Sequence, residues 1–204
     1  MIEALAKVFI GDIYAYEARD ADAIIKRALN EKGANPYALT VWESARVAVD
    51  AIVKRAHRLG QNPRIVDVGS GTGALSLSLS AQGFSTLAID IDQGALDLLS
   101  RAANEQSLSV DTLVLDAFAQ TELFAGLGDW FVFADVLYEQ TLAEKVARCS
   151  ERLVAEKKCV CVLSPKRLGR DRFLKALSCE KKFSRLEGIH TKSDVQWCWL
   201  GELS

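Results

Sequence analysis

Three glycines within five residues mark the part of this 204-residue chain that most restricts its fold. They are Gly69, Gly71 and Gly73, in the run VDVGSGTG at residues 66–73. The apolar start of this run is typical of a buried strand, and a helix is expected from Ala74. Because glycine lacks a Cβ atom, the backbone can turn sharply there and come close to a ligand. A strand, a glycine-rich turn and a helix in this order predict the first unit of a nucleotide-binding α/β sheet.

An acidic residue closes the next apolar run. Asp90 follows residues 86–89 and lies about twenty residues after the glycines, where such a unit places the acid that binds a ribose. Asp67 stands two residues before the first glycine, and Gly73 is bare where a dinucleotide loop tolerates a side chain. Two plainer interpretations stay open: a glycine turn that only packs a helix onto a strand, and an Asp67 that caps the loop without touching a ligand.

The pattern Asp-x-Gly-x-Gly-x-Gly, with an acid ending the next strand, resembles the cofactor loop of class I, seven-strand methyltransferases. That resemblance implies S-adenosyl-L-methionine as the cofactor. The loop backbone would approach its methionine part, and Asp90 would accept hydrogen bonds from both ribose hydroxyls. The implied cofactor-binding residues lie at strand ends and in the helix before the loop: Trp42, Asp67, Gly69, Ser70, Gly71, Gly73, Asp90, Ile91, Asp116, Ala117 and Ala134.

The order of elements predicts a doubly wound, Rossmann-like α/β sheet of seven strands with an antiparallel last strand. Strands are expected at residues 64–68, 86–90, 110–115, 130–134, 159–163, 183–189 and 195–200. Helices are expected at residues 40–59, from 74 after the glycine loop, and at 93–104, 142–153 and 170–177. Residues 75–80 (LSLSLS) alternate with the period of a strand, but the crossover required after the first strand favours a helix.

The whole chain, residues 1–204, is expected to form one domain, because its length suits a single core. Residues 1–60 are predicted to be a helical N-terminal segment, with residues 1–31 helical although weakly periodic. Residues 61–204 are predicted to form the cofactor-binding sheet core.

Composition argues against several classes of protein. A net charge of −2 with 25% charged residues gives no dominant field for nucleic acid or a membrane, and no apolar stretch is long enough to span a bilayer. The five cysteines lack a C-x-x-C spacing, so free thiols in a reducing compartment are expected and a metal site is not. A cytoplasmic monomer is therefore predicted, and a mitochondrial location stays open if a leader has been removed.

The run DVLYE directly after the apolar residues 130–134 suggests the acceptor. Its Asp135 and Tyr138, together with Trp42, resemble the Asp-x-x-Tyr motif and preceding helix of the seven-strand protein-lysine methyltransferases. With LAEKV following at 142–146, the motif looks most like the lysine methyltransferases of the electron transfer flavoprotein beta-subunit and their bacterial relatives. The resemblance covers roughly residues 36–175 and implies a lysine side chain of a protein substrate as the acceptor.

The resemblance also implies roles for the motif. Asp135 would hold the acceptor amine by a hydrogen bond, and Tyr138 would wall the channel during transfer of a methyl group from sulfonium to neutral amine. A carboxylate raises the pKa of a nearby lysine and favours the unreactive ammonium, so Asp135 cannot be a simple activator. Structural interpretations stay open: Asp135 could cap the helix that follows it, and Tyr138 could be ordinary packing.

Other functions remain open. Residues 165–192 carry nine basic and three acidic residues, a solvated helix face or a surface for an acidic partner. A methyltransferase of nucleic acid or of a small-molecule amine is one alternative, although no Asn/Asp-Pro-Pro-Tyr/Phe motif for base methylation is present. A non-catalytic cofactor-binding scaffold is another. A dinucleotide oxidoreductase is disfavoured by Gly73.

Overall fold

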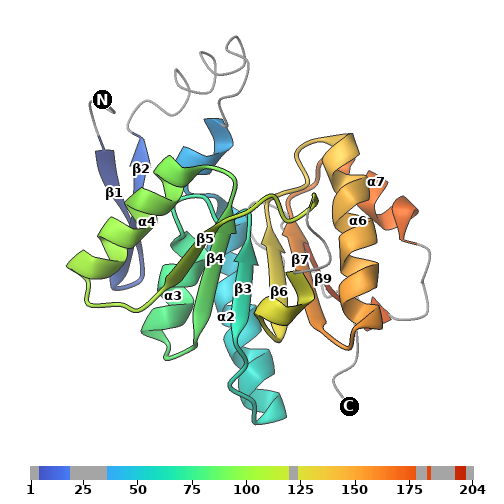
Figure 1. Ribbon diagram of the computed structural model, residues 1–204, viewed down its shortest axis with the longest axis horizontal. Coiled ribbons are helices and arrows are strands. Elements are labelled where there is room, and N and C mark those ends of the chain that lie inside the picture. The colour runs from blue at the N-terminus through green and yellow to red at the C-terminus, as the bar shows by residue number, and fades with distance from the viewer. Residues whose placement is uncertain (1–4, 19–35, 120–123, 178–182, 185–195, 201–204) are drawn as a thin grey trace.

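A seven-stranded sheet forms the centre of the molecule (Figure 1). The structure is a computed structural model that describes residues 5–18, 36–119, 124–177, 183–184 and 196–200. The strand order is β5-β4-β3-β6-β7-β9-β8. The strands are β3 (Ile65–Val68), β4 (Thr86–Asp90), β5 (Asp111–Val114), β6 (Trp130–Ala134), β7 (Cys159–Ser164), β8 (Phe183–Ser184) and β9 (Gln196–Leu200).

Five of these strands are parallel, from β5 across to β7, while β9 runs antiparallel to both β7 and β8. The predicted α/β architecture of a parallel sheet with helices is confirmed. Of the last two predicted strands, residues 185–189 and 195 lie outside the described residues, as does most of the basic segment after residue 177.

Side chains alternate across β6 and build a core on each face of the sheet. Phe131 and Phe133 pack into one apolar cluster with helix α6, whereas Trp130 and Val132 pack into another with helix α2. All four are at most 1% exposed. A strand covered on both faces has no polar alternation, which accounts for its continuous apolar sequence.

Helices fill the connections between the strands. They are α2 (Glu43–Leu59), α3 (Ala74–Ala81), α4 (Gln93–Glu105), α6 (Gln140–Ala155) and α7 (Leu168–Ala176), with short 3-10 turns η1 (Pro36–Leu39) and η2 (Ala125–Leu127). Helix α2 ends at Gly60, whose φ of 62° suits a residue without Cβ. Within the described part of the chain, no helix is both long and apolar enough to cross a membrane.

The helix predicted after the glycine loop is confirmed, since α3 covers the strand-like run at residues 75–80. Its leucines point to two sides of the helix. Leu75 and Leu79 pack with α2 and the sheet, while Leu77 packs against the N-terminal residues 5–18. A helix buried on both sides has no polar face, so its sequence loses the period of 3.6 residues.

The helix predicted for residues 1–31 is wrong for residues 5–18, which form an antiparallel hairpin. Strands β1 (Leu5–Ile10) and β2 (Ile13–Ala18) pair along their length, with Gly11 at φ 64° in the two-residue turn. Gly-Asp between two apolar runs is a known signal for such a hairpin. Residues 1–4 and 19–31 of the prediction lie outside the described residues.

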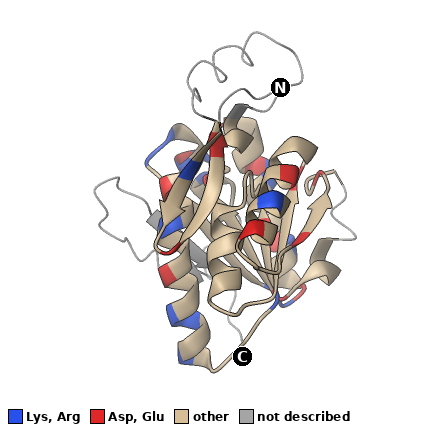
Figure 2. Ribbon diagram, turned by 90° about the vertical axis from the view of Figure 1, so that its left-hand side faces the viewer, with Lys and Arg blue, Asp and Glu red and all other residues tan. Residues whose placement is uncertain are grey.

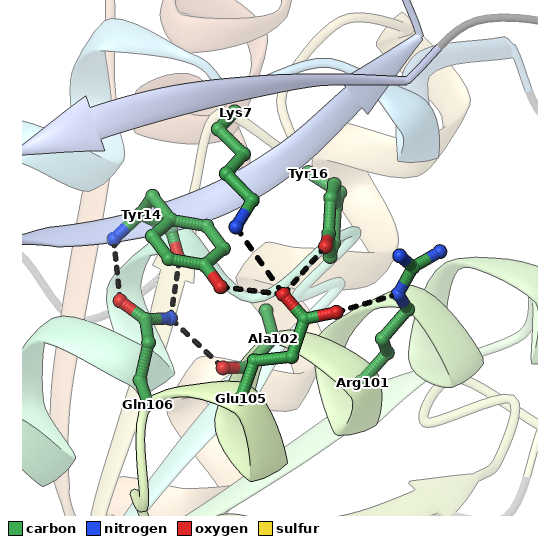
Figure 3. A network of polar contacts seen from close by, with 7 residues as sticks. All are labelled: Lys7, Tyr14, Tyr16, Arg101, Ala102, Glu105 and Gln106. Atoms are coloured by element: carbon green, nitrogen blue, oxygen red, sulfur yellow. Dashed lines mark hydrogen bonds and ion pairs between the residues drawn. The ribbon is translucent and has the colours of Figure 1, made fainter.

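The hairpin is held on α4 by one carboxylate (Figure 3). Glu105 accepts hydrogen bonds from the hydroxyls of Tyr14 (2.6 Å) and Tyr16 (2.7 Å) and from Arg101 Nε (2.8 Å), and Lys7 Nζ lies 3.3 Å away. The tyrosine hydroxyls and the two cations hold the pKa of Glu105 well below its usual range. Since the donors come from β1, β2 and α4, this single acid joins three elements.

The same hairpin positions the next described segment of chain. Gln106 receives the backbone N–H of Tyr14 and donates to its carbonyl, both at 2.8 Å. Glu17 on β2 accepts a hydrogen bond from the backbone N–H of Val41 at 2.8 Å. The hairpin therefore restrains the stretch that leads from η1 into α2.

Replacing Glu105 by Gln should loosen the hairpin. The neutral amide removes the charge that all four donors share, so hydrogen exchange in β1 and β2 should accelerate while exchange in β3 and β6 stays slow.

The same interaction should depend on pH. Because the pKa of Glu105 is lowered in the folded protein, its contribution to folding stability is present above the unfolded pKa of about 4.3 and is lost progressively as pH falls from there toward the lower folded pKa. Glu156→Gln, at an exposed ion pair with Arg152, is the matched control. Equal exchange in both variants would contradict this role.

Candidate active site

A cavity of about 300 Å³ opens at the carboxyl ends of the parallel strands. It lies where the chain switches from one side of β3, with β4 and β5, to the other side, with β6. Ligands of doubly wound sheets bind at this topological switch point. Twelve of the thirteen predicted site residues line the cavity: Trp42, Asp67, Gly69, Ser70, Gly71, Asp90, Ile91, Asp116, Ala117, Ala134, Asp135 and Tyr138.

Two glycines of the loop have other groups directly over them, so a side chain has no room there. Gly71 has a φ of 54°, and a Cβ there would lie 2.7 Å from the carbonyl oxygen of Ala38 in η1. A Cβ on Gly69, at φ 73°, would lie 2.8 Å from Val136. The loop is thus enclosed by η1 on one side and by the segment after β6 on the other.

Gly73 does not line the cavity, although its neighbours Thr72 and Ala74 do. A Cβ on Gly73 would lie 2.1 Å from Leu99 Cδ1, so this glycine allows α4 to pack against the start of α3. A third glycine in such a pattern can serve helix packing as well as a ligand.

Asp90 is oriented by backbone. Its Oδ2 accepts from the N–H of Gly71 at 2.8 Å, and its Oδ1 accepts from the N–H of Asp92 at 3.0 Å. Burial raises the pKa of Asp90, and these N–H groups oppose that rise. A carboxylate has about four acceptor sites, so both oxygens keep capacity for the two hydroxyls of a ribose.

Apolar side chains line the same end of the cavity. Ile91 directly follows Asp90 and is 60% exposed, although it is a large apolar residue. Ala117 and Phe118, after β5, also line the cavity. An exposed isoleucine and an aromatic ring beside a ribose-type acid make a suitable place for the flat adenine of the cofactor.

Asp67 lies between the cavity and helix α3. It lines the cavity, and its Oδ2 accepts a hydrogen bond from the hydroxyl of Ser76 in α3 at 2.8 Å. Burial raises the pKa of Asp67 to about 7, against the lowering effect of Ser76. A nearby cationic ligand would therefore favour the ionised form.

Asp135 has a strained backbone at the end of β6. Its φ of 61° is in the left-handed region, and its N–H donates to the carbonyl of Leu163 at 2.9 Å. Asp135 is 7% exposed, and its carboxylate lies near Ser44 in the first turn of α2. Within the described part of the chain, the Ser44 hydroxyl and Asp135 Oδ1 are both buried without a hydrogen-bond partner. It therefore lies at α2, not at the helix that follows it. Burial raises the pKa of Asp135, and Ser44 and the charge of Arg167 lower it.

Aromatic rings surround this carboxylate's side of the cavity. Tyr138 stacks on Tyr37 with ring centres 4.7 Å apart, and Trp42 lies 6.1 Å from Tyr37 and donates from Nε1 to its carbonyl. Burial raises the pKa of Tyr138 to about 12, with Glu139 and Asp90 adding to the rise. Tyr138 therefore keeps a neutral hydroxyl at any physiological pH.

The charge of the cavity wall is predominantly negative. The charged residues that line it are five acids and one lysine: Asp67, Asp90, Asp116, Asp135, Glu139 and Lys145. Elsewhere the charges mix, and Figure 2 shows acidic and basic positions interspersed over the visible helices and strands. Such a wall suits a cationic occupant and disfavours one that carries phosphates. No group of three or more metal-ligating side chains occurs among the residues that the structure describes.

Comparison with known proteins agrees with the geometry. A family model described as lysine methyltransferase matches residues 23–180. Ribosomal RNA small subunit methyltransferase A of Nostoc sp. is 33% identical over 89 residues, which are 44% of this chain and 32% of that protein. The chain thus spans about a third of the length of this curated relative.

Solved structures share the fold at low identity. The bifunctional kinase-methyltransferase WbdD has a TM-score of 0.63 at 18% identity, over 89% of this chain and 46% of that one. The PH0226 protein of Pyrococcus horikoshii has a TM-score of 0.60 at 12% identity, over 79% of this chain and 92% of that one. SMU.776, described as a putative methyltransferase and solved with SAH, has a TM-score of 0.59 at 11% identity, over 78% of this chain and 49% of that one.

Fold, cavity and comparisons define a class I methyltransferase with S-adenosyl-L-methionine as its cofactor. More particularly, the chain belongs to the lysine methyltransferase family whose model covers residues 23–180.

Several residues at or beside the site were not predicted from the sequence, and three of them bear on its chemistry. Tyr37 is part of the aromatic wall, Ser44 faces Asp135, and Arg167 forms an ion pair with Asp135 at 3.3 Å. Tyr37 follows a proline in a short turn and Arg167 stands between a strand and a helix, so neither belongs to a periodic pattern.

Replacing Gly73 by Ala should destabilise the protein although Gly73 does not line the cavity. The new Cβ meets Leu99 in a left-handed backbone, which together should lower the free energy of unfolding by about 3 kcal/mol. Gly83→Ala has the same kind of backbone at φ 86° but open space around it, and should cost about 1 kcal/mol. Urea unfolding of both variants measures the difference, and equal losses would exclude the packing role.

The raised pKa of Asp67 predicts a pH dependence of stability. A group with a raised folded pKa stabilises fully below its unfolded pKa and loses that contribution as pH rises toward the folded value. Between pH 5 and pH 8 the cofactor-free wild type should therefore lose about 2–3 kcal/mol more than Asp67→Asn. Urea unfolding at the two pH values tests this, with Asp50→Asn on the exposed face of α2 as the control. A wild type with the same pH dependence as Asp67→Asn would contradict it.

Proposed function

We propose that this protein transfers a methyl group from S-adenosyl-L-methionine to the side-chain amine of a lysine in a protein substrate. The observation that carries the proposal is the buried Asp135 carboxylate beside Trp42 and Tyr138 at the cavity wall, next to the cofactor loop. A carboxylate among aromatic rings is a suitable receptor for an amine or ammonium group.

The residues of the chain bind and orient the acceptor. The cofactor, when bound, supplies an electrophilic methyl group on a sulfonium. Asp135 accepts a hydrogen bond from the acceptor amine and fixes the direction of its lone pair, while the neutral Tyr138 closes the side of the channel. With the cofactor bound, the N–C bond would form as the S–C bond of the sulfonium broke, and Asp135 would stabilise the positive charge that develops on nitrogen. The extra proton of the methylammonium then leaves to solvent.

Charge supports lysine over a nucleic acid. Apart from the acids assigned to the cofactor, the charged residues of the cavity wall are Asp135, Glu139 and Lys145. Of these, the buried Asp135 carboxylate would attract a cationic side chain and repel an acceptor's phosphates. The family model favours lysine as well.

Methylation of an RNA base is the second candidate, and one observation favours it. The curated relative with 33% identity over 89 residues is a ribosomal RNA methyltransferase. The acidic wall argues against it.

Residues 135–139 and 142–146 support a narrower proposal, a substrate of the electron transfer flavoprotein beta-subunit type. The electron transfer flavoprotein beta-subunit is therefore the first protein to test as acceptor. A monomeric state and a cytoplasmic location stay predictions from composition.

The test uses cofactor with a radiolabelled methyl group, a cell extract, and the purified flavoprotein subunit. Labelled lysine should appear in a protease-sensitive product. Asp135→Asn keeps the backbone type and should reduce the label at least about 100-fold, because the amine loses its charged acceptor, while cofactor affinity measured by calorimetry changes little. Asp171→Asn, an exposed acid in α7, is the control. Label in nuclease-sensitive material would establish the second candidate, and cofactor binding without label would indicate a scaffold.

A further inference from the structure

A cation lies beside the proposed acceptor site without entering it. Arg167 Nη2 is 3.3 Å from Asp135 Oδ1, and the guanidinium is 5.2 Å from the centre of the Trp42 ring. Asp135 and Trp42 line the cavity, whereas Arg167 does not. Arg167 therefore contacts both residues from behind the wall, and its side chain is 31% exposed.

Close packing of α7 fixes this position. Arg167 is the N-cap residue of α7, with an extended backbone at φ −137°. Two residues later, a Cβ on Gly169 would lie 2.0 Å from the carbonyl oxygen of Leu137. The bare Gly169 thus lets the first turn of α7 touch the segment between Asp135 and Tyr138. The packing of Gly169 against Leu137 therefore places Arg167 next to Asp135, in addition to the ion pair itself.

We propose that Arg167 is a positioning residue for methyl transfer, which holds the Asp135 carboxylate from behind the cavity wall and offsets its charge so that the acceptor amine binds as the free base. The inference rests on the proposed function. A carboxylate that binds an amine also favours the unreactive ammonium form of that amine. The charge of Arg167 would reduce this effect.

The remaining charges around the site cannot replace Arg167. The cavity wall carries Asp67, Asp90, Asp116 and Glu139, which all favour an ammonium ion, and the titratable hydroxyls of Tyr37 and Tyr138. From α2, the neutral Ser44 lies near Asp135, and its hydroxyl makes no hydrogen bond to any described residue. Lys145 on α6 is the cation of the wall. Among the described residues, Arg167 is the cation that forms an ion pair with Asp135, the proposed hydrogen-bond acceptor of the amine.

The first measurement is the pH dependence of methyl transfer between pH 7 and pH 10. Arg167→Met leaves the Asp135 charge uncompensated, so the acceptor amine should stay protonated to higher pH. We expect the acid limb of kcat to move up by about one pH unit, which is about a tenfold loss at pH 7. The KM for the acceptor should not rise, since an ammonium binds the bare carboxylate at least as well.

Two variants separate charge from structure. Arg167→Lys keeps a cation and should keep the pH profile near that of the wild type. Arg172→Met removes the α6–α7 ion pair with Glu144, away from the cavity, and should leave the profile unchanged. A purely structural role would lower kcat in Arg167→Met without moving the limb, and that result would overturn the inference.

A second measurement needs no acceptor. With carboxyl-13C aspartate and Asp135→Asn to assign the signal, NMR titration should give a higher pKa for Asp135 in Arg167→Met than in the wild type, because a cation that lowers it is gone. If Asp135 has the same pKa in Arg167→Met and in the wild type, the inference is wrong. If the wild type methylates no lysine but Asp135 still responds to Arg167, the proposed function fails while the coupling of the two residues stands.

Discussion

The hydrogen bond from the Gly71 N–H to the Asp90 carboxylate joins the turn after β3 to the end of β4, and the site is arranged around it. It requires a backbone that curves with φ near 54°, and that curve leaves room for the carbonyl of Ala38 above the loop. A side chain at Gly71 would displace both partners. The acid, the loop and the segment over it are therefore one unit, joined by the Asp90 side chain and by the backbone of Gly71 and Ala38.

Much of this unit is predictable because a parallel strand that is buried on both faces has a continuous apolar sequence. Strands β4 and β6 have the bounds that the sequence predicts, since both are apolar on each face and β4 closes on an acid. The cavity residues follow from the rule that ligands meet strand ends. Gly73 shows the limit of the rule, because a glycine in such a pattern can also allow a neighbouring helix such as α4 to pack closely.

The hairpin at residues 5–18 and the ion pair of Arg167 are not predictable in this way. The weak periodicity of the first residues hides a two-residue turn, and the hairpin depends on Glu105, about ninety positions away in sequence. Arg167 reaches Asp135 only because Gly169 lets α7 approach Leu137. Contacts between distant segments have no local signal, so a sequence gives the framework of the site more readily than the residues that adjust its charge.

The left-handed backbone at Asp135 restricts what evolution can place there. Glycine, asparagine and aspartate adopt this conformation at low cost, and a branched or bulky residue does not. Most single replacements would therefore impair folding and chemistry together, whereas asparagine would remove the charge and little else. A lineage that gave up methyl transfer but kept cofactor binding could replace Asp135 by asparagine or glycine without straining the backbone.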